Sequence, residues 1–326
     1  MSMKSHIAIV ATVLAALAGQ GTRAAANGPP SSAATSQSAG TSSETSETSE
    51  TLQEVTVTAH HLELEKRVSK FVAQIAVMEN GAEGLARWQK PSVCPLVSGL
   101  PQQDGEFILE RVSEIARASG VPLAAEHCRP NFYILVTDQP EDLLRAMEKR
   151  DRRFTFGYDA TSGSNPPAET RQTAVDAFIK TPRAVRVWYN AYERDDWGQP
   201  IPLCPFGNGE YIQCPPAFAG GTRALLSTTW AISTVFVVAD QARLHKVKLG
   251  QLADYVAMTG FAKLKPEAHL DNAPTILTLF DGTPEAAPAG MTDWDETFLK
   301  SLYATDQKSK NQRSQIAHRM AREIAP

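Results

Sequence analysis

The chain has 326 residues, a formal net charge of −4 and an apolar fraction of 42%. This composition allows a sizeable core, and the length allows one large domain or two small ones. The small net charge argues against nucleic acid as a partner, because neutralising phosphates needs clustered Lys and Arg.

Residues 1–26 have the pattern of a cleaved secretory signal. A basic start is followed by the apolar stretch Ile7–Ala18, and Ala24 and Ala26 give the small-x-small pattern that signal peptidase requires. The stretch is too short to span a bilayer of about 30 Å as a helix, and no later run reaches that length. We expect a soluble mature protein that begins at about Asn27 and is periplasmic or secreted.

Residues 27–53 are rich in Ser, Thr, Ala and Gly, carry a Glu-Thr-Ser repeat and contain no aromatic residue. Such a segment buries too little apolar area to offset the entropy lost on ordering it. The sequence therefore predicts a disordered linker here, followed by a globular domain over residues 54–326.

Apolar periodicity predicts helices and strands in alternation along this domain. In chain order we expect a strand at 54–59, a helix at 61–78, an irregular segment at 88–99, a helix at 104–119, a strand at 131–137, a helix capped by Asp138 with Pro140 in its first turn, a loop at 151–167, a helix at 168–180, a strand at 184–189, a long excursion at 195–221, one or two strands at 225–239, and helices at 248–260, 271–280, 292–303 and 307–324. This order predicts an α+β fold with a small mixed or antiparallel sheet and several packed helices.

The cysteines are Cys94, Cys128, Cys204 and Cys214. In an exported chain an even number favours disulfides, and four cysteines allow three pairings. We favour Cys204–Cys214, because the intervening Asn-Gly turn brings them together, and hence Cys94–Cys128. Zinc would need closely spaced Cys or His pairs, which do not occur, so the sequence predicts no metal site and no cofactor.

Sequence motifs for catalysis are absent. There is no G-x-S-x-G elbow, no P-loop and no G-x-G-x-x-G. A zinc peptidase would place H-E-x-x-H on the helix after the buried strand, but the one-turn pair there is Gln251 and Tyr255, neither of which is a usual zinc ligand. We therefore predict no catalytic residue. A degenerate metallopeptidase relative without its zinc ligands stays open as an alternative.

Four residues are candidates for binding. Gln251, Asp254 and Tyr255 form a polar helix face directly after a buried strand, where a cleft often has its rim; a solvated helix face is the alternative. Trp188, together with its neighbour Tyr189 and with Trp197, surrounds the Pro-rich excursion. These aromatic residues are suited to a sugar or peptide groove, with core packing as the alternative.

Four stretches carry a resemblance to known sequences: Cys94–Leu100, Cys128–Asn131, Pro182–Tyr189 and Gly250–Tyr255. On these, most of residues 60–326 resembles a group of uncharacterised exported proteobacterial proteins. The resemblance implies an exported location and transfers no activity and no site residue.

These observations lead to two hypotheses. The first is an exported, non-catalytic binding or envelope-associated module, whose partner is an envelope protein or a small ligand. The second is a hydrolase-like enzyme of degenerate metallopeptidase descent. Converging titratable groups in a groove would favour the second.

Overall fold

The structure is a computed structural model that describes residues 61–79, 84–90, 92–156, 168–195, 197–201, 203–206, 210–213, 225–265, 268, 270, 273–283 and 286–325. By its contacts the chain divides into Met1–Glu50 and Thr51–Pro326, and all described residues belong to the second unit. The predicted signal peptide, linker and strand at 54–59 lie outside the described residues. No helix in the described ranges is long and apolar enough to cross a bilayer.

The described elements follow most of the predicted ones. The helices are residues 61–75, α2 (Gln102–Ser119), α3 (Pro140–Arg150), α4 (Arg152–Phe156), α5 (Ala168–Lys180), α6 (Leu249–Phe261), α7 (Asp293–Ala304) and α8 (Gln312–Ile324), with the 3-10 helices η1 (Gln241–Arg243) and η2 (Ile276–Phe280). The strands are β1 (Arg87–Trp88), β2 (Pro95–Ser98), β3 (Phe132–Thr137), β4 (Val185–Arg194), β5 (Leu203–Phe206), β6 (Glu210–Gln213) and β7 (Thr229–Asp240).

The main sheet has five strands with β7 at its centre. On one side β7 pairs antiparallel with β4; on the other it pairs parallel with β1 and β3, and β2 continues the sheet parallel to β3. The sheet is thus mixed and mostly parallel, and the expected antiparallel alternative is wrong. The reason lies in α2, because a helical crossover returns the chain to the same end of the sheet before β3 begins.

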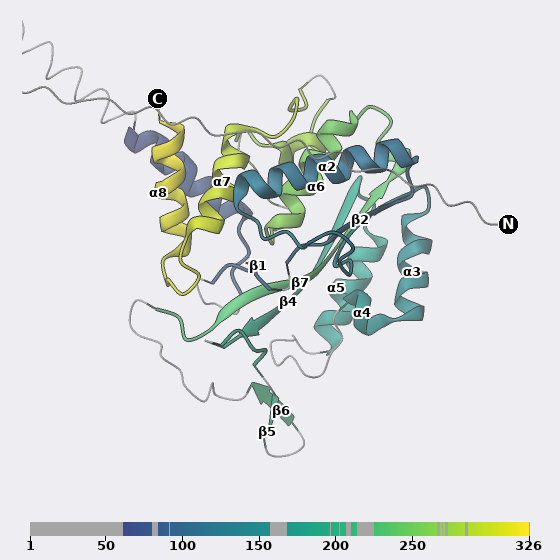
Figure 1. The fold of residues 1–326 in the computed structure, drawn as a ribbon, viewed down its shortest axis with the longest axis horizontal. Coiled ribbons are helices and arrows are strands. Elements are labelled where there is room, and N and C mark those ends of the chain that lie inside the picture. Colours follow the sequence, from purple (N-terminus) through teal and green to yellow (C-terminus); the bar gives the residue numbers. More distant parts are fainter. Residues whose placement is uncertain are drawn as a thin grey trace, which may run out of the picture. The chain divides into compact units, whose positions relative to one another are not determined.

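Helices cover both faces of this sheet, as Figure 1 shows. Helices α2 and α6 lie side by side over one face, called here the α6 face, and α3, α4 and α5 cover the other, called here the α3 face. Coverage on both sides explains why β3 and the second half of β7 are nearly continuous apolar runs. The α6 face holds most of the core, whereas the α3 face has a small cluster around Leu144, Phe156, Val175, Ile179 and Val238.

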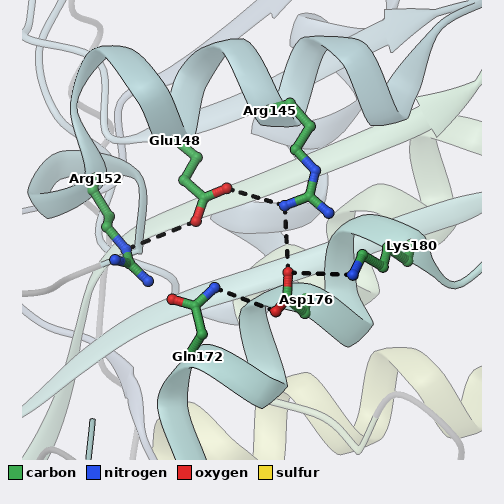
Figure 2. A network of polar contacts seen from close by, with 6 residues as sticks. All are labelled: Arg145, Glu148, Arg152, Gln172, Asp176 and Lys180. Carbon is green, nitrogen blue, oxygen red and sulfur yellow. Dashed lines mark hydrogen bonds and ion pairs between the residues drawn. The ribbon is translucent and has the colours of Figure 1, made fainter. Parts of the chain in front are cut away.

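A network of ion pairs ties the helices of the α3 face together (Figure 2). Arg145 Nη1 of α3 lies 3.2 Å from Glu148 on the same helix and 3.3 Å from Asp176 on α5. Gln172 donates to Asp176, and Lys180 and Arg152 complete the network. The network lies at the surface and links α3 to α5.

Two segments differ from their predictions. Residues 95–98 form β2 rather than irregular chain. Pro95 argued against a strand in the sequence, but a short edge strand tolerates proline at its first position. Gly99 then turns with φ +90°, and a Cβ there would lie 1.8 Å from the Val136 carbonyl oxygen. Within the expected loop at 151–167, α4 forms where the Asp151 carboxylate accepts from the Phe154 N–H.

Two helix ends, at α2 and α7, are closed by residues of the expected capping types, whereas the start of α3 is not. Gly120 ends α2 with φ +75°, and Thr292 and Asp295 form a capping box at the start of α7. At α3 the N-cap is Gln139, which makes no side-chain cap, so the prediction that Asp138 caps this helix is wrong. The nearby Thr137 Oγ1 instead accepts from the Gln139 N–H.

A disulfide joins Cys94 to Cys128, as predicted. It links the amino ends of β2 and β3, where Asn131 also donates to the Ser92 carbonyl and accepts from the Cys94 N–H. Cys204 lies in β5 opposite Ile212 of β6, but Cys214 is outside the described residues, so the second pairing stays a prediction.

Candidate functional site

The strand register places three polar side chains in a row at the carboxyl ends of β3 and β7. Thr137 of β3 lies opposite Asp240 of β7, and Arg186 of β4 lies opposite Val238, two residues before Asp240. Because alternate residues of a strand share a face, all three point toward the α3 face, where Val238 joins the core cluster. We call Thr137, Asp240 and Arg186 the carboxyl-edge row. Open α/β sheets place ligands at this edge.

The Asp240 carboxylate is bound by residues that follow it closely in the sequence. Its carboxylate accepts from the Ala242 N–H at 3.1 Å, which starts η1, and lies 3.2 Å from Nε of Arg243. Its backbone N–H donates to the Ala184 carbonyl, which joins β7 to the segment before β4. The Asp240 side chain is 13% exposed, whereas that of Arg243 is 51% exposed.

Arg186 is the buried member of the row. It is 5% exposed, and its Nε donates to the carbonyl of Thr181, just beyond the end of α5. Its Nη1 is also buried and has no hydrogen-bond partner among the described residues. Burial lowers the pKa of the Arg186 guanidinium, with Asp240 acting in the opposite direction. An unmade bond to a buried donor is costly, so this atom needs an explanation.

The residues at the start of α3, called here the rim of the row, are more exposed than Arg186, which forms its floor. Asp138 and Glu141, at the start of α3, are exposed. Glu141, Arg243 and Arg183 all act electrostatically on Arg186. The amino end of α3 adds the partial positive charge of a helix start. Asp142 lies in the same first turn as Glu141, so the rim is acidic, whereas the donor without a described partner, Nη1 of Arg186, is buried.

The predicted residues Gln251 and Asp254 lie on the α6 face and are buried, at 7% and 4% exposure. The Gln251 side chain accepts from the Lys248 N–H and donates to the Pro288 carbonyl. Asp254 accepts from Arg111 at 2.7 and 3.3 Å and from the Met291 N–H at 2.7 Å. Both side chains thus fasten the segment 288–291 to α6.

Tyr255, also on α6, and Trp188, on the opposite face, contact other groups. Tyr255 packs edge-to-face on Phe280 at 5.0 Å, and burial raises its pKa to about 12. Trp188 lies on the α3 face, 5.2 Å from the Phe156 ring and 5.3 Å from the Phe178 ring. The structure therefore brings Gln251 and Asp254 together and separates both from Trp188.

The proposed aromatic groove is not assembled as one surface. Tyr189, the neighbour of Trp188, faces the α6 side and donates to the Thr259 carbonyl. Trp197 is 64% exposed in a turn in which the Asp195 carboxylate accepts from the N–H groups of Trp197 and Gln199. The three aromatic residues thus belong to different environments.

A small surface pocket lies beside Asp254, between α2 and α7. Its walls include Arg111 and Met291, the two residues that bind the Asp254 carboxylate, together with Lys300 and Glu296. Lys300 and Glu296 pair with each other at 3.4 Å. Asp254 therefore lies behind the wall of this pocket, and the charges at the wall are already compensated.

Within the described part of the chain, no three His, Cys, Asp or Glu side chains gather where they could hold a metal ion. The one-turn pair of the metallopeptidase comparison, Gln251 and Tyr255, contacts separate segments, 288–291 and η2.

The sequence reasoning missed the carboxyl-edge row. Thr137 ends one predicted strand and Asp240 directly follows another, which is the signal that was available. Using this signal requires the two strands to be parallel, and the sequence predicted either a mixed or an antiparallel sheet; in an antiparallel pair the two ends would lie at opposite edges. Arg186 gave no signal, since one arginine in an apolar strand is usual at a sheet edge.

Comparisons with known proteins do not extend this description. No protein-family model matches the chain, and neither the curated proteins nor the solved structures that were searched gave a match.

Proposed function

We propose that the protein is an exported binding module that takes a small ligand at the carboxyl-edge row. The observation that carries the ligand site is the buried Nη1 of Arg186, which has no partner among the described residues at the sheet edge where α/β folds bind ligands. Buried donors without a partner are uncommon in folded proteins, and a bound water or ion is one explanation for them.

Export is supported by two independent features. The amino-terminal sequence has the signal pattern, and the Cys94–Cys128 disulfide is of a kind that persists in oxidising compartments. Sequencing the amino terminus of the protein from the periplasmic fraction should give a start at about Asn27. Ala26→Tyr, which blocks the peptidase pocket, should leave the precursor uncut; wild-type protein that starts at Met1 would refute export.

The ligand site is tested by thermal-shift screening of small metabolites against the wild type and Arg186→Met. A ligand of the row should raise the melting temperature of the wild type and leave the variant unchanged. Asp254→Asn serves as the control, because it alters a buried charged residue on the other face. A ligand whose effect depends on Asp254 and not on Arg186 would move the site to the α6 face.

A further inference from the structure

We infer that the outer edge of β4 is an interface for a second copy of this chain, whose own β4 pairs with it antiparallel about a twofold axis at Trp188. The interface is independent of the proposed ligand site. It follows from the direction of the backbone groups along β4, from the edge that they leave open and from the order of the side chains.

The pairing of β4 with β7 shows which backbone groups of β4 point away from β7. The Asp240 N–H donates to the carbonyl of Ala184, the residue directly opposite. In an antiparallel pair, opposite residues exchange hydrogen bonds at every second position. Trp188 is therefore bonded to β7, whereas Val187 and Tyr189 direct their N–H and C=O groups outward.

This outward edge is open over residues 185–191. Beyond it, the Ile201 N–H donates to the Glu193 carbonyl and closes the edge. Among the described residues, no strand or backbone group bonds to the outer side of the open stretch, and residues 187–191 are half-buried. The extra residue of the nearby bulge, Ser233, is on β7, so β4 itself continues without interruption.

The other edge of the sheet is protected, and β4 is not. Strand β2 has four residues and begins with Pro95, which has no N–H. Short edge strands and proline are two devices that prevent further strands from adding to a sheet. Strand β4 has ten residues and no proline. An edge of this length is either covered by a partner strand or prone to aggregation.

The side chains of the open stretch are self-complementary about Trp188. A twofold axis there places Trp188 opposite its own copy and gives these further opposite pairs: Val187 with Tyr189, Val185 with Ala191, and Arg186 with Asn190. Apolar side chains meet on the α6 face, and the two indoles form an aromatic pair on the α3 face. The outward groups of Val187 and Tyr189 exchange both hydrogen bonds, twice over because of the axis. A twofold dimer requires a self-complementary surface of this kind.

Hydrogen exchange of the mature wild-type protein tests this interface without any substitution. The protein is measured from about 1 to 100 μM, with the dimer fraction taken from sedimentation equilibrium. The outward amides of Val187 and Tyr189 should become protected as the dimer forms. The inward amide of Trp188 should stay protected throughout, because its bond to β7 exists in the single chain.

A proline substitution tests the same bonds by their removal. Val187→Pro deletes an outward N–H and leaves the bonds to β7 in place, and edge strands tolerate proline at such positions. Because the axis deletes this donor twice, the dissociation constant of the dimer should rise about tenfold or more. Val187→Ala is the matched control, since it shortens the same side chain and keeps the N–H; it should raise the constant only roughly threefold.

Concentration-dependent protection of the outward amides supports the inference, and it decides the matter even if Val187→Pro fails to fold. A chain that stays monomeric up to about 100 μM overturns the inference, as does a dimer that leaves these amides unprotected. Equal weakening by Val187→Pro and Val187→Ala overturns it as well, because the outward N–H would then contribute nothing. Protection that is complete at the lowest concentration would show that the edge is already covered within a single chain, and this too rejects the second copy.

Discussion

Two buried charged side chains, one on each face of the sheet, differ in how fully the chain binds them. On the α6 face, Asp254 accepts from both nitrogens of the Arg111 fork and from the Met291 amide. On the α3 face, Arg186 has one bond from Nε and an open, buried Nη1. The first arrangement is complete without a ligand, and the second is not. Polar residues in a core therefore need to be judged by their unmade bonds rather than by their charge.

The largest expected effect on the free energy of unfolding is at Asp254 on the α6 face, whose carboxylate is fully hydrogen-bonded. Asp254→Ala should lower the free energy of unfolding by about 2–4 kcal/mol, because it leaves the Met291 N–H without its acceptor and frees the segment 288–291. Asp254→Asn keeps one acceptor and should cost less. Urea unfolding measures both. A cost below about 0.5 kcal/mol for Asp254→Ala would mean that the carboxylate does not hold this segment.

Packing on the α6 face can be tested within one helix. A Cβ added at Gly260 would lie 2.1 Å from the ring of Phe132, whereas one added at Gly250 meets no atom within 4 Å. Gly260→Ala should therefore cost about 1–3 kcal/mol by overpacking, and Gly250→Ala should be neutral or stabilise by up to about 1 kcal/mol. Equal effects in thermal unfolding would show that the end of α6 can move away from β3.

Sequence patterns predicted these elements better than their arrangement. The run from Asn131 to Thr137 and the helix at 168–180 were recognisable because apolar spacing and length are local properties. Strand direction is set by the crossover between strands, and β2 is too short and too rich in irregular signals to show that crossover. The apparent polar face of α6 was misread for the same reason, since the segment 288–291 that covers it is about 37 residues further along the chain.

Replacing Arg186 on the α3 face, whose Nη1 has no described partner, should affect the free energy of unfolding far less than replacing Asp254. Arg186→Met replaces a buried guanidinium by an apolar side chain of similar length, so the unmade bond and the desolvated charge disappear together. We expect unfolding free energy within about 1 kcal/mol of the wild type, although a buried charge has been removed. Urea unfolding in buffer without added ligand checks it. A loss as large as that of Asp254→Ala would show that Arg186 is fully bound in the free protein.

The smallest effect is expected at the surface of the α3 face, in the network of Figure 2. The hydrogen bond from Gln172, followed by that from Arg145 and the charge of Lys180, lowers the pKa of Asp176. A carboxyl group whose folded pKa is depressed stabilises the fold above its unfolded value of about 3.9, and this contribution is lost as the pH falls through the folded pKa. The melting temperature of Asp176→Asn should therefore lie slightly below that of the wild type at pH 7, and the two should converge as the pH falls below about 4.

Sodium chloride at about 1 M should shrink the difference at pH 7, because the residue is at the surface and its ion pairs are screened. A difference that is unchanged by acid and by salt would mean that the network contributes through packing rather than through charge.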